Sequence, residues 1–460
     1  MSNASADAAR GHWLSRFGFL MAAIGSAVGL GNFWRFPYLT GENGGGAFVL
    51  LYLASVIGIV LPLLVAEFVI GRRAQTSAIR GVARVASESG APILWGLMPA
   101  IGILGTFLIL TFYSVIGGWV LAYIGMATQG VFTGADSATV GQLFDAMLAD
   151  PERLIVNHAI FMGLTVLIVI LGVNNGLETV NSVLMPALFL MLVGLVIYAA
   201  LYGDFARATA FLFTPDWSEV TWASARDAIS QGFFSVGISG ALMVTYAGYA
   251  KHDLNLGGSA LLIALADTLI ALLAGLAIFP IVFSHGMDPG QGPGLTFVTL
   301  PIALGDLPGA TIAATAFFVL LLFAAITSSI SLLELPVAEA AERGLPRIAG
   351  ALIFGGVCFA IGIGSVYSFN SWAEFYPFSF VPGLEKASIF DSLDAATSKI
   401  MLPLASILVA LFSGYAMKWT IATEELRWTS AAALNLLRVM LMVVCPVVLV
   451  VVMIANLGVF

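Results

Sequence analysis

Residues 25–37 read Gly-Ser-Ala-Val-Gly-Leu-Gly-Asn-Phe-Trp-Arg-Phe-Pro and interrupt the first apolar segment of the chain. Three glycines within seven positions weaken a helix, and proline favours a helix end just before it. Backbone that leaves a helix inside a bilayer has unpaired N–H and C=O groups, which are tolerated only beside protein or a water-filled cavity. Half-helix ends direct dipoles at a ligand and freed carbonyls can bind a cation, so this stretch is a candidate ion and solute site.

The composition indicates a membrane protein with many spans. Hydrophobic residues make up 60% of the 460 residues, and charged residues only 10%. Apolar runs of about 20 residues, long enough to cross the ~30 Å hydrocarbon core, recur along the chain. We predict one transmembrane domain, residues 1–460, with eleven helices. Their expected ranges are 15–39, 47–71, 93–128, 154–173, 179–203, 226–252, 257–285, 309–341, 346–367, 388–418 and 430–458.

Charge and composition also predict the location and exclude some function classes. Most Arg and Lys residues near the span ends, such as Arg72 and Arg343, fall on the side of the N-terminus, so we expect that terminus in the cytoplasm. We expect a multi-pass protein of the cell inner (plasma) membrane. Cys358 and Cys445 lie in apolar spans and predict no disulfide or metal site. Catalytic groupings and a basic stripe for nucleic acid are not recognisable, so we expect no enzyme and no nucleic-acid partner.

A second interruption lies five spans after the first. Residues 231–240 read Gln-Gly-Phe-Phe-Ser-Val-Gly-Ile-Ser-Gly. Spans one to five (15–203) and six to ten (226–418) would then have opposite orientations, because each half holds an odd number of spans. Broken helices at matching positions predict an inverted-repeat secondary transporter, with the last span (430–458) outside the repeat. The alternative, that the glycines only permit close helix packing, stays open.

The chain resembles the neurotransmitter:sodium symporter family, especially its eleven-span bacterial amino-acid transporters. The resemblance covers nearly the whole chain and rests on residues 25–37, 42–48 (Glu-Asn-Gly-Gly-Gly-Ala-Phe), 233–235 (Phe-Phe-Ser) and 327–329 (Thr-Ser-Ser). It implies an all-α polytopic membrane protein with a LeuT-like fold, a 5+5 inverted repeat with broken helices 1 and 6. It also implies sodium-coupled symport by alternating access. A membrane sensor of the same fold that binds an amino acid without transporting it is the alternative.

Two sodium sites follow from the resemblance, each with several oxygen ligands, as a hard cation prefers. The first would be formed by Ala27, Asn32, Ser235 and Asp267, and the substrate carboxylate would complete it. The second would be formed by Gly25, Val28, Ala324, Thr327 and Ser328. A mid-span carboxylate such as Asp267 is costly and indicates function by default. Thr327 and Ser328 could instead bond to the helix carbonyl four residues earlier, and Asn32 could simply end a helix.

Asp267 also predicts independence from chloride. Many family members have Asn at this position and bind chloride nearby, and the matching neighbours here are Tyr52, Gln231 and Ser235. We infer that the Asp267 carboxylate supplies the negative charge itself. A second hypothesis is that Asp267 takes up a proton when sodium leaves, which would give proton antiport.

The expected substrate is an amino acid, with the lipid bilayer as the other partner. Amine-transporting relatives have Asp at the position of Gly29, so its absence argues for a solute that carries its own carboxylate. Groups of Leu30, Gly31 and Tyr113 would bind that carboxylate, and carbonyls of Ala27, Phe234 and Ser235 would bind the ammonium.

The side chain of the substrate would lie in a largely apolar pocket. Its expected lining is Ser26, Ile109, Tyr113, Phe234, Gly237, Gly240, Ser328 and Leu332. Because Gly237 and Gly240 leave space in the wall, we predict neutral, hydrophobic L-amino acids, with bulky or aromatic ones favoured.

Two gates complete the expectation. Outside, Arg35 would pair with Asp394, or alternatively with Asp391, above Phe234. On the cytoplasmic side, the expected latch consists of Arg10, Trp13, Tyr249 and Glu342. The resemblance further implies that the inner end of span five unwinds and admits water, which would suit Glu178.

Overall fold

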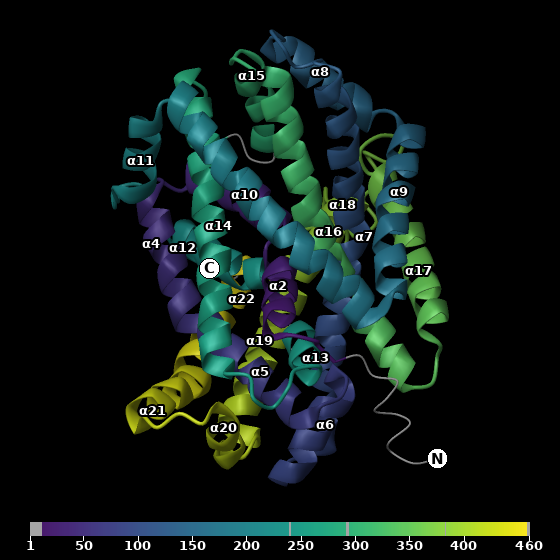
Figure 1. Cartoon of the computed structure of the whole chain (residues 1–460), viewed down its shortest axis with the longest axis vertical. Helices are drawn as coiled ribbons and strands as arrows, with labels where there is room; N and C mark the ends of the chain where they lie inside the picture. Colours follow the sequence, from purple (N-terminus) through teal and green to yellow (C-terminus); the bar gives the residue numbers. More distant parts are fainter. Residues whose placement is uncertain (1–11, 239–240, 291–293, 382, 458–460) are drawn as a thin grey trace.

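The computed structural model describes residues 12–238, 241–290, 294–381 and 383–457, which form an elongated bundle of helices (Figure 1). Within these ranges no β-strand is present, apart from an isolated bridge between Gly45 and Pro215. The all-α prediction is therefore confirmed. We call the end of the bundle at the bottom of Figure 1 the lower end and the opposite end the upper end.

Nine continuous helical stretches of the described chain are long and apolar enough to cross a membrane. Short π-helical segments, such as Val56–Val60, join the pieces of several of them. Their helices are α4 (Gly46–Ser55) with α5 (Leu61–Ala74), α7 (Met98–Thr128), α9 (Pro151–Ile170), α10 (Thr179–Tyr202), α14 (Leu256–Ser284), α16 (Ala310–Glu342), α17 (Arg347–Tyr367), α18 (Ile389–Asp394) with α19 (Leu402–Leu411), and α21 (Ala431–Val439) with α22 (Cys445–Asn456).

The first and sixth predicted spans are broken, as expected. Helix α2 (Arg16–Ala27) ends where Val28 adopts an extended conformation (φ −76°, ψ 108°). The chain resumes as the π-helical segment Gly31–Arg35 and α3 (Phe36–Glu42), bent by 50° from α2.

Helix α12 (Trp222–Val236) ends at Gly237, whose left-handed conformation (φ 68°) suits a residue without Cβ. Helix α13 (Leu242–Gly248) follows, and residues 239–240 between them lie outside the described part. In the described chain, the bent pair α2–α3 brings the number of stretches long and apolar enough to cross a membrane to ten. Helices α12 and α13 occupy the range predicted for the sixth span.

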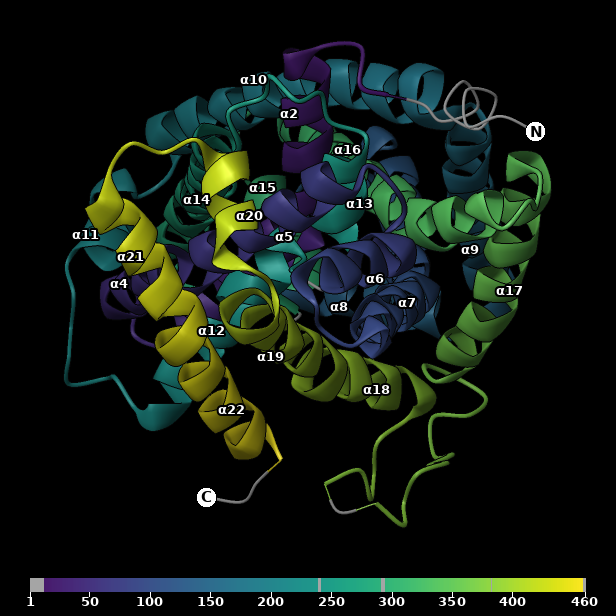
Figure 2. The same cartoon turned by 90° about the horizontal axis from the view of Figure 1, so that it is seen from below.

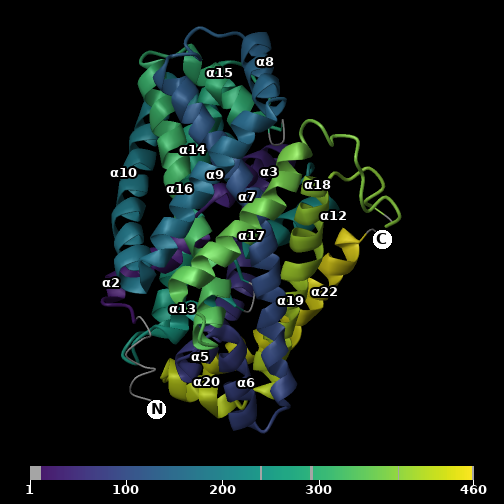
Figure 3. The ribbon, with the colours of Figure 1, turned by 90° about the vertical axis from the view of Figure 1, so that its right-hand side faces the viewer.

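The broken helices are packed among the continuous ones. Helix α2 contacts α10 and α16, α12 contacts α4, and α13 contacts α5. Seen from below, α5 and α13 lie near the middle, with α10, α17 and α22 on the rim (Figure 2). Figure 3 shows α10 along one side of the bundle and α22 along the other. The breaks in α2–α3 and α12–α13 therefore face protein rather than lipid, as unpaired backbone requires.

Shorter helices between the spans cover both ends of the bundle. Helices α8 (Ser137–Leu148) and α15 (Leu300–Gly305) lie at the upper end, and α11 (Phe205–Phe213) lies on the upper flank (Figure 1). Helices α6 (Ala78–Ser89) and α20 (Trp419–Leu426) lie at the lower end. These segments fall between the predicted spans, and several begin with a polar cap, as Asp136 does for α8 by accepting from Thr139 N at 2.8 Å.

A buried arginine ties three segments together at the lower end. Arg72 of α5 is 1% exposed, and its Nε lies 2.6 Å from Glu425 Oε2 on α20. Its guanidinium also donates to the carbonyls of Leu254 and Glu425. The neighbouring Arg73 is more exposed and pairs with Glu88 and Glu424 at the surface.

Replacing Arg72 by Met should therefore destabilise the protein far more than the matched change at Arg73. Arg72→Met removes the closest cationic partner of the buried Glu425, which keeps only Arg73 at 3.6 Å, and removes the guanidinium donor from two carbonyls. Breaking a buried pair in this way costs about 3–5 kcal/mol. Arg73→Met removes surface ion pairs worth about 1 kcal/mol or less. Thermal unfolding of the detergent-purified variants measures the difference. Equal midpoints for the two variants would contradict this account of Arg72.

Candidate sodium and substrate site

A small cavity of about 60 Å³ lies where the two breaks meet. Its lining is Ser26, Ala27, Gly29, Leu30, Gly31, Thr106, Ile109, Tyr113, Phe234, Ser235, Gly237, Leu242, Ser328, Leu332 and Leu402. Every predicted substrate residue is among them except Gly240, which lies outside the described residues. Side chains or backbone from α2, α7, α12, α13, α16 and α19 thus converge on one space. None of these lining residues carries a charge.

Asp267 lies at the centre of the first predicted cation group, on α14. It is fully buried, and its Oδ2 accepts from Ser235 Oγ at 2.8 Å and from Tyr52 OH at 3.3 Å. Its Oδ1 accepts from Asn32 Nδ2 at 2.8 Å. Asn32 Nδ2 also lies 3.3 Å from Ser235 Oγ. Three of the four predicted ligands are therefore in mutual contact, and the fourth, Ala27, lines the adjoining cavity.

This group has the chemistry of a cation site. A carboxylate held away from water is strongly disfavoured unless donors or a cation neutralise it. Asn32 is oriented by its own backbone region, because its Oδ1 accepts from Gly29 N at 3.1 Å. If the side-chain amide of Asn32 rotates by half a turn, its oxygen replaces its NH2 group beside Asp267. That oxygen is a suitable ligand for a cation. Asn32 therefore does more than end a helix: its side chain bridges the break in α2–α3 and α14.

The second predicted cation group joins α2 to α16. Ser328 Oγ lies 3.1 Å from the Val28 carbonyl and 3.3 Å from the Gly25 carbonyl. These carbonyls are free because the helix stops at Val28, and Gly29 N bonds to Asn32 instead. Thr327 Oγ1 lies 3.0 Å from the Ala324 carbonyl. All five predicted residues are thus gathered, with oxygen atoms of α2 facing those of α16.

Thr327 and Ser328 could have bonded to the carbonyl four residues earlier in their own helix, and only Thr327 does so. Thr327 Oγ1 does bond to the Phe323 carbonyl four residues earlier, at 3.0 Å. Ser328 Oγ instead crosses to the carbonyls of α2. Ser328 is therefore committed to the interface between the two helices.

Gly29 and Tyr113 shape the wall of the cavity next to the break. Tyr113 OH accepts from Leu30 N at 3.3 Å, so one freed amide of the break is already paired. A Cβ atom added at Gly29 would lie 2.5 Å from Ser328 Oγ and 2.9 Å from Tyr113 OH. Any side chain at this position would displace both hydroxyls, which explains the need for glycine here.

The cavity is smaller than the sequence predicted. Space was expected at Gly237, but a Cβ atom added there would lie 3.2 Å from Leu242 Cδ2. Leu242, which the sequence analysis did not include, fills that space, and Leu402 is a further lining residue that it did not include. By the same measure a water needs about 10–15 Å³, so the cavity holds only a few water-sized groups. The prediction also missed Gly29 and Thr106 as lining residues.

Glu67 is a second carboxylate within a membrane span, and the sequence analysis missed it. It is fully buried on α5, and its Oε2 accepts from Met243 N at 3.2 Å. Met243 lies in the first turn of α13, whose backbone N–H groups have no partner within the helix. Glu67 therefore caps the half-helix that follows the second break. Its position within the predicted span 47–71 is the signal that could have identified it.

The outer gate differs from the predicted ion pair. The Arg35 guanidinium lies over the Phe234 ring, 4.5 Å from its centroid, and Phe234 in turn lines the cavity. Arg35 forms no ion pair within the ranges that the structure describes. Asp391 is used as a helix cap, accepting from Ser388 Oγ at 2.8 Å. Asp394 is not used in this way and acts electrostatically on Arg35, so of the two predicted partners it is the one left available.

The lower side of the cavity is closed by aromatic rings. Trp13 Nε1 donates to the Tyr246 carbonyl at 2.8 Å, and Trp13 N donates to the Tyr249 carbonyl at 3.2 Å. Tyr249 OH donates to Glu334, which also accepts from Arg347 Nη1 at 3.1 Å. The predicted Trp13–Tyr249 contact is therefore present, and Glu334 with Arg347 extends it. The sequence analysis did not include this ion pair.

Two other residues of the predicted latch have different surroundings. Arg10 lies outside the described residues, so its partner stays a prediction. Glu342 accepts from Thr76 Oγ1 and from Ser77 N, both at 2.8 Å.

Glu178, at the inner end of the fifth predicted span, is buried and not, as predicted, in contact with water. Its carboxylate accepts from Leu14 N at 2.7 Å and caps the start of α2. The inner end of this span is wound in the structure, as a π-helical turn (Val173–Glu178) leading into α10.

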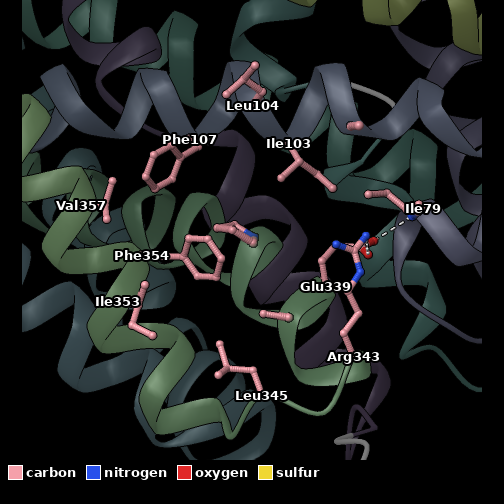
Figure 4. Close-up of a pocket in the computed structure, with 13 residues that line it drawn as sticks. Ile79, Ile103, Leu104, Phe107, Glu339, Arg343, Leu345, Ile353, Phe354 and Val357 are labelled. Carbon is pink, nitrogen blue, oxygen red and sulfur yellow. Dashed lines mark hydrogen bonds and ion pairs between the residues drawn. The ribbon is translucent and has the colours of Figure 1, made fainter.

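A larger pocket of about 510 Å³ lies apart from this site (Figure 4). It is formed between α6, α7, α16 and α17, and Leu104, Ile353 and Val357 in its wall are exposed on the outside of the bundle. Glu339 and Arg343 lie together on one side of it, and Glu339 accepts from Ile79 N at 2.7 Å (Figure 4). Because its wall is apolar and faces outward, we interpret this pocket as a groove on the lipid-facing surface of the protein and not as the solute site.

Comparison with known proteins decides the family. A model of the Sodium:neurotransmitter symporter family matches residues 10–136 and 142–460. The chain belongs to the sodium:neurotransmitter symporter family. Members of this family are transporters rather than enzymes, and their transport is coupled to sodium. The chain is therefore a multi-pass membrane protein that transports a small molecule with sodium.

Relatives cover almost the whole chain. An uncharacterized sodium-dependent transporter of Bacillus subtilis, YhdH, is 39% identical over 87% of this chain and 86% of its own length. An uncharacterized sodium-dependent transporter of Haemophilus influenzae is 32% identical over 88% and 89%. The crystal structure of MhsT in complex with L-phenylalanine matches with a TM-score of 0.88 and 39% identity, over 97% of this chain and all of that one. This match confirms the LeuT-like fold.

Proposed function

We propose that this family member is a symporter that couples two sodium ions to the uptake of neutral, hydrophobic L-amino acids, with bulky or aromatic ones favoured. The observation that carries the proposal is the contact between the two breaks. A buried carboxylate and freed carbonyls lie on either side of a cavity that adjoins both cation groups. A zwitterion fits this arrangement, because its carboxylate can join the cation ligands near Ala27 while its ammonium meets freed carbonyls.

The lining of the cavity supports a neutral, apolar side chain. Leu30, Ile109, Leu332 and Leu402 surround it, and no charged residue is among the lining residues. Burying a charged substrate side chain here would leave that charge unpaired, which is strongly unfavourable. Because Leu242 fills the wall at Gly237, a large substrate requires Leu242 to move. The solved structure of MhsT with L-phenylalanine supports an aromatic substrate for a protein of this fold.

Alternating access would use the two closures found around the cavity. Phe234 under Arg35 separates it from the upper end, and Trp13 with Tyr249 separates it from the lower end. Sodium at Gly25 and Val28 would hold α2 against α16 while the solute is bound. We place the lower end in the cytoplasm and the protein in the cell inner membrane, because Arg72, Arg343 and most other basic residues near span ends lie there.

The surroundings of Asp267 support transport without chloride. Its Oδ2 lies between the hydroxyls of Ser235 and Tyr52, at 2.8 and 3.3 Å. Two hydroxyl donors that converge on one point bind an anion, and here the anion is the carboxylate itself. Gln231, the third neighbour, donates to the Gly31 carbonyl at 3.0 Å. A separate chloride ion would therefore compete with Asp267 for the same donors and repel its charge.

Uptake into proteoliposomes tests the proposed function. With an inward sodium gradient, labelled Leu, Phe or Trp should accumulate, whereas Lys and Glu should not. Replacing sodium by choline, or dissipating the gradient with a sodium ionophore, should abolish accumulation. Binding of an amino acid without accumulation under any gradient would contradict transport and favour a sensor.

Replacing Asp267 by Asn should make uptake depend on chloride. The wild type should transport equally well in chloride and in gluconate, because its carboxylate supplies the negative charge. Asp267→Asn removes that charge but keeps the shape, so chloride beside Tyr52 and Ser235 should be needed to restore uptake. Measuring initial rates in both anions decides the question. Loss of wild-type uptake in gluconate, or chloride-insensitive uptake by the variant, would contradict the proposal.

A further inference from the structure

A buried amide on α10 lies against the second cation group and belongs to none of the predicted sites. Asn181 is 0% exposed. Its Nδ2 donates to the Leu177 carbonyl, one turn earlier in the chain, at 2.7 Å. A carbonyl accepts only from a donor, so this hydrogen bond determines which way the amide is turned. The oxygen, Oδ1, therefore points away from its own helix.

Asn181 Oδ1 points at Gly25 of α2. A Cβ atom added to Gly25 would collide with this oxygen, and it would lie 3.1 Å from Thr327 Cβ. Gly25 and Thr327 both belong to the second cation group, so Asn181 Oδ1 lies at its edge on the side of α10. In the described part of the chain no donor bonds to Oδ1, although the atom is buried. Buried acceptors in proteins almost always have a partner, so this one calls for an explanation.

We propose that Asn181 is a positioning residue for the sodium ion of the second site. This inference rests on the proposed function. The oxygen faces the Cα side of Gly25, whereas the Gly25 carbonyl faces Ser328. A water molecule bound to the ion would donate to Asn181 Oδ1 and so connect the two. A bridging water of this kind is nearly as favourable as a direct hydrogen bond. The second site thereby draws on α10 in addition to α2 and α16.

The same stretch of α10 holds α2 at another point. Glu178 accepts from Leu14 N at 2.7 Å and from Ser15 N at 3.1 Å, and a Cβ atom added to Gly18 would collide with its carboxylate. Glu178 thus holds the start of α2, and Asn181 meets α2 at Gly25 near its end. A sodium ion bound at the second site would tighten the second of these contacts. Release of sodium would remove the link through Asn181 and leave the contacts at Glu178 in place.

The assignment predicts a change in sodium affinity that is separate from substrate affinity. Asn181 does not line the substrate cavity. Asn181→Leu keeps the branching and the number of heavy atoms of the side chain but removes the oxygen. The sodium concentration for half-maximal substrate binding should therefore rise roughly 3- to 10-fold, the effect of losing one hydrogen bond. Asn181→Thr keeps an oxygen that can donate to the Leu177 carbonyl and still accept from water, so its value should lie between those of the wild type and Asn181→Leu.

The experiment is equilibrium binding of labelled L-leucine to detergent-purified full-length protein over a series of sodium concentrations at constant ionic strength. Asn174→Leu is the matched control. Asn174 lies in the π-helical turn that leads into α10, and its buried Oδ1 also has no hydrogen-bond partner among the described residues. The atoms nearest to the Cβ position of Gly25 come from Asn181 and Thr327 and not from Asn174. This control should keep the wild-type sodium dependence. At saturating sodium, all variants should bind L-leucine with the wild-type affinity.

Thermal unfolding in choline separates this role from a purely structural one. If Asn181 only fills space, Asn181→Leu changes the unfolding temperature in choline and leaves the sodium dependence of binding as in the wild type, which overturns the assignment. The assignment is also overturned if Asn181→Thr needs as high a sodium concentration for half-maximal substrate binding as Asn181→Leu does. If the wild type itself shows no effect of sodium, the proposed function fails, and the role of Asn181 fails with it.

Discussion

Unpaired backbone groups at the two helix breaks are the constraint on which the rest of this structure depends. In the hydrocarbon layer each such group must find a partner within the protein. The carbonyls of Gly25 and Val28 face the hydroxyl of Ser328 on α16, and the N–H of Met243 is bonded by Glu67 on α5. The first break thus exposes oxygen atoms that suit a cation, and the second break exposes amide hydrogens that require a carboxylate. Each break is stabilised by a neighbouring helix, so a movement of that helix changes what the break can bind.

The position of Asp267 follows from the same constraint. A full charge in mid-membrane is tolerated only with several donors or a counter-ion, and Asn32, Ser235 and Tyr52 supply the donors. Because Asn32 lies in the first break and Ser235 beside the second, one carboxylate connects both. Coupling between cation and solute then needs no long-range mechanism, since both would bind the same few atoms. The closed arrangement of Phe234 above and Trp13 below means that solute entry requires the helices to move.

Much of the site could be predicted from the sequence because breaks inside a span are recorded in glycines and polar residues. Residues 25–31 and Ser328 lie where the pattern placed them. Properties that depend on packing between distant segments could not be predicted. Leu242 fills the space that Gly237 was expected to leave, because the wall depends on where α13 packs. Arg35 lies over the Phe234 ring rather than in an ion pair, since a planar cation can choose between a carboxylate and an aromatic face.

The central claim is that an amino acid and sodium share ligands, so the binding of each must strengthen the other by the same factor. The most direct test measures that factor both ways on the purified protein: the dissociation constant of L-leucine with and without sodium, and that of sodium with and without L-leucine. We predict that the factor by which saturating sodium lowers the L-leucine constant equals the product of the factors by which L-leucine lowers the constants of the two sodium ions. Dissociation constants for L-leucine that are equal in sodium and in choline would contradict the account.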